Sequence, residues 1–146
     1  MTWFRRTGGF SLIELLVVLA LMGLLFSIAL PRLTGAVAQR DVRNARAATA
    51  NLYAKARVHA VQRRVPATLR FSGDAVLITV PRGAGLDTLG GISDLGDQFR
   101  VAVQVSGGPV VIAPNGLVRS GLPLRAVFTR AGKADTLDLT GYGQVQ

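Results

Sequence analysis

The chain has 146 residues, 49% of them hydrophobic, which is enough for one domain and a long helix but short for two ordinary domains. It has no cysteine and one histidine, which excludes disulfides, thiolate metal sites and His-rich metal or acid–base constellations. The net charge of +9, from 17 basic and 8 acidic residues, suggests lipid headgroups, nucleic acid or acidic protein surfaces as partner classes.

The N-terminal segment is a hydrophobic run that follows two arginines. Residues 10–30 are 21 residues with one charge, Glu14. As a helix rising about 1.5 Å per residue, the run would be about 31 Å long, which matches a hydrocarbon core of about 30 Å. Arg5 and Arg6 precede the run, and the positive-inside rule keeps that end in the cytoplasm. We therefore predict a single membrane span, with the rest of the chain exported.

The order of small and apolar residues argues against an ordinary secretory signal peptide. Such a signal has an apolar region of about 7–15 residues with a small-residue cleavage site after it. Here the apolar run is longer, and Gly8 and Gly9 stand before it. Cleavage at these glycines would leave the hydrophobic segment in the mature protein.

The residues at this junction resemble a known processing motif. The segment Gly9-Phe10-Ser11-Leu12-Ile13-Glu14 has basic residues before it and about 16 uncharged residues after it, and it is similar to the type IV prepilin motif. The resemblance implies that a prepilin peptidase cuts between Gly9 and Phe10 on the cytoplasmic face of the bacterial inner membrane. It also implies that residues 1–9 are a leader and that Phe10 becomes N-methylated.

Glu14 is a functional candidate because it is a carboxylate inside an apolar run. An acidic residue near the centre of a membrane helix costs about 2.5–3.5 kcal/mol on insertion scales. In one interpretation Glu14 sits at the end of the span, where it reaches the headgroups and the helix N-terminus favours its charge. In the other, implied by the resemblance, it pairs with the cleaved amino group of a neighbouring subunit. We favour the pairing, because leaving either buried charge alone is expensive.

A second helical pattern follows Pro31 and continues to about Arg64. Pro31 is expected to kink the helix or to start a locally melted stretch, and Pro66 favours an exit into extended chain. Apolar residues spaced three, four and eight apart fall on one face, which would pack on a sheet. These residues are Leu33, Val37, Ala45, Ala48, Leu52 and Ala56.

The excess positive charge belongs to this helix. Residues 32–64 carry eight basic groups and one acid, whereas residues 65–146 carry seven basic and six acidic groups. At about 100° per residue, five arginines fall within a narrow arc opposite the apolar face. The arc is either a solvated face or a contact with acidic subunits, anionic lipid or DNA, and we hypothesise subunit packing. This basic stripe consists of Arg32, Arg43, Arg46, Arg57 and Arg64.

After Val65 the pattern changes to the alternation typical of strands. A hairpin is predicted over residues 68–80, a long loop over 81–98, a half-buried strand over 99–105, and a final strand pair over 124–139. The predicted fold class is α+β, a long N-terminal helix packed on a C-terminal antiparallel β-sheet domain, as in pilins. The predicted parts are a leader (1–9), a transmembrane and assembly helix (10–30), an amphipathic second half of the helix (31–64) and a periplasmic β domain (65–146).

Later segments resemble the H-type (GspH-like) minor pseudopilins and the FimT-like minor pilins. The end of the second helical pattern, the turn Ile112-Ala113-Pro114-Asn115-Gly116 and the C-terminal tail are similar to theirs in this order. In FimT-like proteins that take up DNA, basic residues of the tail contact phosphate. This chain has Gln144 and Gln146 at those positions. Because phosphate contacts supply most non-specific affinity for DNA, nucleic acid is not an expected partner.

The sequence offers no case for an enzyme, a cofactor or a metal. His59 has no cysteine and no glutamate near it in the sequence, and it is interpreted as a helix-surface side chain. Asp87, Asp94 and Asp97 fall within one predicted loop and could bind Ca²⁺, but their spacing fits no known loop. We interpret them as solvated acids.

Three functions remain open. The favoured one is a minor pseudopilin of a type II secretion system, at the tip of a periplasmic pseudopilus. Its partners would be other major and minor pseudopilins, the prepilin peptidase and the inner membrane. The second is a minor pilin of a type IV pilus, in pilus assembly or DNA uptake. The third is a membrane-tethered binding domain that never polymerises, against which Glu14 and the Gly9–Phe10 junction argue.

Overall fold

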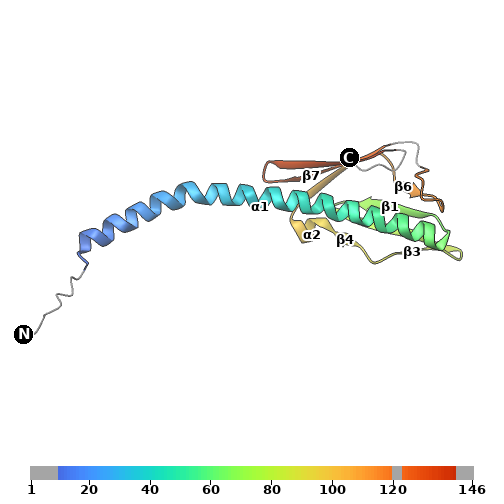
Figure 1. Cartoon of the computed structure of the whole chain (residues 1–146), viewed down its shortest axis with the longest axis horizontal. Coiled ribbons are helices and arrows are strands. Elements are labelled where there is room, and N and C mark those ends of the chain that lie inside the picture. The colour runs from blue at the N-terminus through green and yellow to red at the C-terminus, as the bar shows by residue number, and fades with distance from the viewer. Residues whose placement is uncertain (1–9, 120–122, 141–146) are drawn as a thin grey trace, which may run out of the picture. The chain divides into compact units, whose positions relative to one another are not determined.

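The computed structural model describes residues 10–119 and 123–140, which fall into two compact units that divide between Ala36 and Val37. Helix α1, Leu12–Arg63, has 52 residues and contributes to both units (Figure 1). It continues through Pro31, so the melted stretch that we gave as one outcome is wrong. Proline removes a single backbone N–H, and the helix keeps its hydrogen bonds on both sides of that position. The helix ends at Arg63, after which Arg64 takes a left-handed conformation (φ 54°).

The first sheet begins with the predicted hairpin, which is confirmed. Strands β1 (Ala67–Ser72) and β2 (Ala75–Arg82) pair antiparallel, with Ser72 opposite Ala75. Strand β6 (Val110–Ile112) pairs with the other edge of β1. Strands β3 (Gly85–Thr88) and β4 (Ser93–Asp94) pair with β2. The order is therefore β3-β2-β1-β6, with β4 beside the start of β2.

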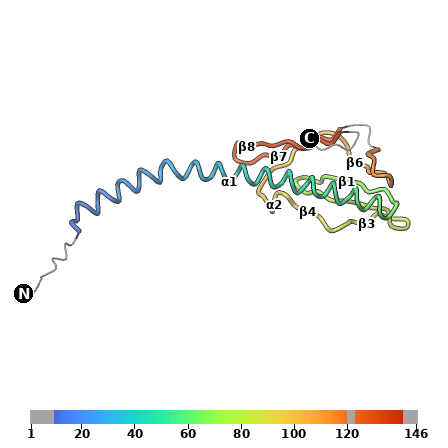
Figure 2. Tube along the Cα trace, viewed as in Figure 1, coloured from blue at the N-terminus to red at the C-terminus, as the bar shows by residue number. Residues whose placement is uncertain are grey.

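The second sheet contains the predicted C-terminal strand pair, also confirmed. Strands β7 (Leu124–Arg130) and β8 (Lys133–Leu139) pair along their full length, and β5 (Ala102–Ser106) adds to the other edge of β7 (Figure 2). The described strands of this sheet have the order β5-β7-β8. The buried side chains of β7 alternate along the strand, as expected for a sheet with one face in the core.

The predicted long loop over residues 81–98 is wrong. It contains the end of β2, strands β3 and β4, and the start of a short helix α2, Leu95–Phe99. The glycines and aspartates of this stretch are boundaries between short elements. Gly83 (φ 60°) turns β2 into β3, and Asp94 caps α2 by accepting the backbone N–H of Asp97 at 3.0 Å. The next strand accordingly starts later than predicted, because Phe99 still belongs to α2.

The turn after β5 leads into a different sheet, which the sequence pattern did not indicate. Gly107 takes φ +105°, and a Cβ placed there would lie 2.6 Å from the Pro123 carbonyl oxygen. Such an approach of two backbones needs glycine. The chain therefore passes from β5 in the second sheet to β6 in the first at this point.

One hydrophobic core joins both sheets to the second half of α1, which runs alongside them in Figure 1. Phe128, Leu69 and Ile78 are the largest fully buried side chains of the sheets. The helix contributes mainly small residues, and these let its backbone lie close to the strands. Its buried positions recur every three or four residues and are Ala38, Val42, Ala45, Thr49, Tyr53, Ala56 and Ala60.

The predicted apolar face of the helix was only partly right. Ala45 and Ala56 are buried, as predicted, whereas Val37 is 43% exposed. The core instead includes Thr49, whose hydroxyl donates to the Ala45 carbonyl at 3.0 Å and so leaves no unpaired group in the core. Three of the six predicted residues are alanines, and two of these, Ala45 and Ala56, lie in the buried face that the structure shows.

Truncation of Phe128 tests this account of the core. We expect Phe128→Ala to lower the free energy of unfolding by about 3–5 kcal/mol, because the lost contacts leave a cavity among well-packed neighbours. Urea unfolding of the full chain in detergent, followed by circular dichroism, measures this change. Leu117→Ala, at a side chain that is 55% exposed, should change the same quantity by less than about 0.5 kcal/mol. Similar losses in the two variants would contradict the packing described.

Candidate processing and assembly site

The start of α1 is fixed by a capping interaction that places Glu14. Ser11 precedes the first helical residue, and its hydroxyl accepts the Glu14 backbone N–H at 3.2 Å. The Ser11 carbonyl also accepts from the N–H groups of Glu14 and Leu15. Serine followed three residues later by glutamate is the capping-box pattern, a signal that was present in the sequence and that our sequence analysis did not use.

The first half of α1 exposes apolar side chains without interruption. The large apolar residues from Phe10 to Leu30 are between 44% and 80% exposed. By length and composition this helix could span a membrane: its most apolar window has a mean hydropathy of 2.6 and is 0% buried. A continuous apolar surface of this extent indicates contact with lipid or with other protein.

Polar groups inside the apolar stretch are satisfied by the helix itself. The Ser27 hydroxyl donates to the Leu24 carbonyl at 2.8 Å, and the Thr34 hydroxyl donates to the Pro31 carbonyl at 2.9 Å. Hydrogen bonds of this kind remove the cost of placing a hydroxyl in an apolar environment. Glu14 differs from both, because its carboxylate has no ion-pair partner in the described part of the chain.

Gly9 lies outside the described residues, so at the Gly9–Phe10 junction the structure describes only Phe10 and the residues after it. There, Phe10 is 80% exposed and precedes the first helical turn. Glu14 lies in that turn, near the N-terminal end of α1, where the helix dipole favours a negative charge. At this junction the exposed position of Phe10 leaves room for a peptidase. The unpaired carboxylate of Glu14, four positions later, can pair with an amino group.

Comparison with known proteins agrees with these features. Residues 4–30 match the model of the prokaryotic N-terminal methylation motif. The fold is similar to a crystal structure of the Pseudomonas aeruginosa type IV minor pilin FimU, with a TM-score of 0.59 and 16% identity over 73% of this chain and 87% of that one. A second crystal form of FimU gives a TM-score of 0.56, again at 16% identity, over 71% and 90% of the two chains. No curated protein matches the sequence significantly.

This chain has a type IV pilin-like fold. It combines the N-terminal methylation motif with one long helix packed on an antiparallel β domain, so both the expected superfamily and the expected fold class are confirmed.

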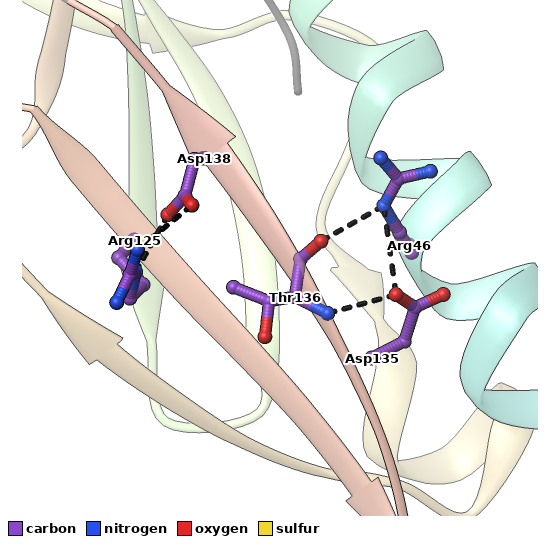
Figure 3. Close-up of polar contacts among 5 residues, drawn as sticks. All are labelled: Arg46, Arg125, Asp135, Thr136 and Asp138. Atoms are coloured by element: carbon purple, nitrogen blue, oxygen red, sulfur yellow. Dashed lines mark hydrogen bonds and ion pairs between the residues drawn. The ribbon is translucent and has the colours of Figure 1, made fainter.

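The pilin-like domain uses one arginine of the basic stripe for its own stability. Arg46 reaches from α1 to β8, where its Nε donates to the Thr136 carbonyl at 2.9 Å and lies 3.8 Å from Asp135 (Figure 3). Its side chain is 36% exposed. Arg46 therefore has a contact within the domain, because the small-residue face of the helix brings it within reach of the sheet, and partner contact through Arg46 stays a prediction.

The other arginines of the stripe have different surroundings. Arg32 and Arg43 are exposed and have no ion pair within the described residues. Arg57 is also exposed, but it lies over the Pro114–Gly116 turn, where a Cβ at Gly116 would be 3.3 Å from its Nε. Arg64 is exposed and follows the end of the helix. Partner contact through these four stays a prediction.

A second ion pair joins α1 to the strands, and here the helix supplies the acid and the strand supplies the arginine. Asp41, the only acid of residues 32–64, pairs with Arg130 at the end of β7. Arg130 also donates to the Phe99 carbonyl at 3.1 Å. Both side chains are less than a quarter exposed. The sequence held a signal for this contact, because a lone acid in a strongly basic helix is a candidate for a specific pair.

The exposed face of the second sheet carries a cross-strand pair that fixes the register of β7 and β8. Arg125 and Asp138 form two parallel hydrogen bonds of 2.7 and 2.9 Å (Figure 3). Hydrogen bonding from Arg125 lowers the pKa of the Asp138 carboxyl below its ordinary value, and its charge adds to the effect. The stability that this pair contributes is therefore present above the ordinary carboxyl pKa and is lost as the pH falls through the lowered value.

Of the three acids considered as Ca²⁺ ligands, Asp87 and Asp94 make other contacts within the domain. Asp87 accepts from Arg82 at 2.9 Å and from the Thr88 backbone N–H, and Asp94 caps α2. Asp97 is exposed. Among the described residues no three His, Asp or Glu side chains are grouped so that they could hold a metal.

Replacing Arg46 and Arg43 separately tests whether one arginine is structural and the other is not. We expect Arg46→Ala to lower the free energy of unfolding by about 1 kcal/mol, because a charged hydrogen bond to a half-buried carbonyl is lost. Arg43→Ala, an equal truncation one helical turn earlier, should change it by less than about 0.5 kcal/mol. Urea unfolding of both full-length variants provides the measurement. A larger loss for Arg43→Ala would contradict the assignment.

Proposed function

We propose that this chain is a non-enzymatic structural subunit of a filament built from pilin-like proteins. The observation that carries the proposal is an uninterrupted exposed apolar helix with one carboxylate in its first turn, directly after the processing motif. The helix anchors the subunit in the membrane first and is then buried among neighbouring helices in the filament. In both settings the apolar side chains from Phe10 to Leu30 leave water.

Glu14 supplies register to this assembly. Cleavage between Gly9 and Phe10 creates a positive amino group four residues before it. Within a packed filament the carboxylate of one subunit can neutralise the amino group of the next, and any other axial offset leaves both charges alone in apolar surroundings. The pair thus selects one arrangement even where its net contribution to stability is small.

The orientation follows from charge. Arg5 and Arg6 keep the leader in the cytoplasm, where the peptidase acts, and the domain after the span lies in the periplasm. Phe10 would be N-methylated after cleavage. The prepilin peptidase, the inner membrane and other pilin-like subunits are then the partners.

Substitutions at Glu14 test this role. We expect Glu14→Gln and Glu14→Val to leave processing intact and to abolish incorporation into filaments, because both remove the negative charge that pairs with the amino group. Intact-mass analysis should show loss of residues 1–9 and gain of one methyl group in both variants. Filament fractions probed for the subunit report its incorporation. Ser27→Ala, which changes a self-satisfied hydroxyl of the same helix, should assemble normally. Normal assembly of Glu14→Gln would overturn the pairing.

For the particular filament, we favour the type II secretion pseudopilus, in which this chain would be a minor, GspH-like pseudopilin at the tip. Gln144 and Gln146 support this choice, because they replace the tail arginines of DNA-binding relatives; both lie outside the described residues. The second candidate, a minor pilin of a type IV pilus, is favoured by the fold similarity to FimU.

Deletion of the gene in its native host separates the two filaments. A pseudopilin predicts loss of secreted proteins from the medium, their accumulation in the periplasm, and unchanged surface pili. A pilus subunit predicts the reverse. Complementation with the wild-type chain should restore the lost phenotype, whereas complementation with Glu14→Val should not. Normal secretion with loss of pili would overturn the pseudopilin proposal and leave the filament proposal standing.

A further inference from the structure

A groove lies between the C-terminal end of α1 and the β2–β3 region. It consists of two adjoining hollows of about 540 and 600 Å³, which share the side chains of His59 and Leu89. On the helix side the lining positions recur three and four residues apart, so they form one strip. On the opposite side lie the ends of β2 and β3 and the segment that follows. The helix positions are Asn51, Ala54, Lys55, Val58, His59, Gln62 and Arg63. We call this feature the His59 groove.

The groove has the length of a short peptide segment. Its helix side runs from Asn51 to Arg63. At about 1.5 Å per helical residue this is roughly 18 Å, which accommodates about five residues of extended chain. Val58, which is 53% exposed, and Leu89 give the groove an apolar floor.

The charges of the groove are positive and not balanced within the described residues. Lys55 and Arg63 are exposed and have no ion-pair partner there. The one acid in the lining, Asp87, is already paired with Arg82 at 2.9 Å. Most other described acids of the domain are also occupied, in the pairs with Arg46, Arg125 and Arg130 or in backbone hydrogen bonds. The groove therefore keeps two uncompensated positive charges, one beside each hollow.

His59 adds an unsatisfied polar atom at the centre. Its Nδ1 is buried and makes no hydrogen bond within the described residues, although its ring lines both hollows. A buried nitrogen without a partner is unusual, because most such groups are paired.

We propose that the His59 groove binds an acidic, partly apolar extended segment of a different pilin-like subunit. The proposal rests on the filament function for the source of the segment. A second copy of this chain is a poor occupant, because the chain has a net charge of +9. Single-stranded nucleic acid binds by stacking successive bases on aromatic side chains, and the described lining contains no Phe, Tyr or Trp. Carboxylates meet Lys55 and Arg63, while apolar side chains cover Val58 and Leu89.

Labelled peptides provide the test, with the full chain in detergent. One eight-residue peptide alternates Glu with Leu and Val, and its control carries Lys in place of each Glu. Fluorescence anisotropy at about 0.15 M ionic strength, where charges act over about 8 Å, measures the affinities. We expect the acidic peptide to bind at least tenfold more tightly than the basic one. The binding assay uses unassembled protein. If the acidic peptide does not bind, the filament proposal is unaffected, and if filaments do not assemble, the peptide affinities can still be interpreted.

Matched variants separate the groove from general charge attraction. Lys55→Glu with Arg63→Glu should weaken binding of the acidic peptide at least tenfold. Arg119→Glu with Lys133→Glu makes the same change in net charge at exposed sites outside the groove and should weaken it less than threefold. Val58→Ser keeps the charge, removes part of the floor and should weaken binding severalfold.

Three outcomes would overturn the proposal. They are equal affinity for the two peptides, equal weakening by the two charge-reversed pairs, and tighter groove-dependent binding of a short DNA duplex than of the acidic peptide. The last outcome would assign the groove to nucleic acid.

Discussion

The close packing of the small-residue face of α1 on the two sheets is the interaction on which the rest of the domain depends. Alanines at positions 38, 45, 56 and 60 let the helix backbone lie close to the strands, so that a single core serves both sheets. The short approach also brings Arg46 to the Thr136 carbonyl and Asp41 to Arg130. Larger side chains at the alanine positions would hold the helix away and separate both pairs.

The same helix must satisfy two different environments along its length. Up to about Leu30 its apolar side chains are exposed, the Ser27 hydroxyl bonds to a carbonyl of the same helix, and Glu14 is the one charge. From Ala38 onward one face is buried in the β domain and the rest carries arginine and lysine. This division gives one helix both a part that exposes a continuous apolar surface and a part with one face buried in the β domain.

The ion pairs inside the domain determine which charged side chains are left without an internal partner. The acids of the sheets and of α1 are largely used in internal pairs, whereas several basic groups have no counterpart within the described residues. A surface of this kind attracts acidic groups and repels basic ones, since like charges repel at contact distance.

The sequence by itself determined the methylation motif over residues 4–30, the long apolar start of the helix and both hairpins. The motif and the apolar run depend on local order and spacing, and both hairpins follow from turn residues between alternating strands. Only the tertiary structure decided that Arg46 faces β8, that β5 and β6 belong to different sheets, and that Thr49 and Tyr53 enter the core. These depend on distances between segments far apart in the sequence, and periodicity within one helix or strand contains no information about them.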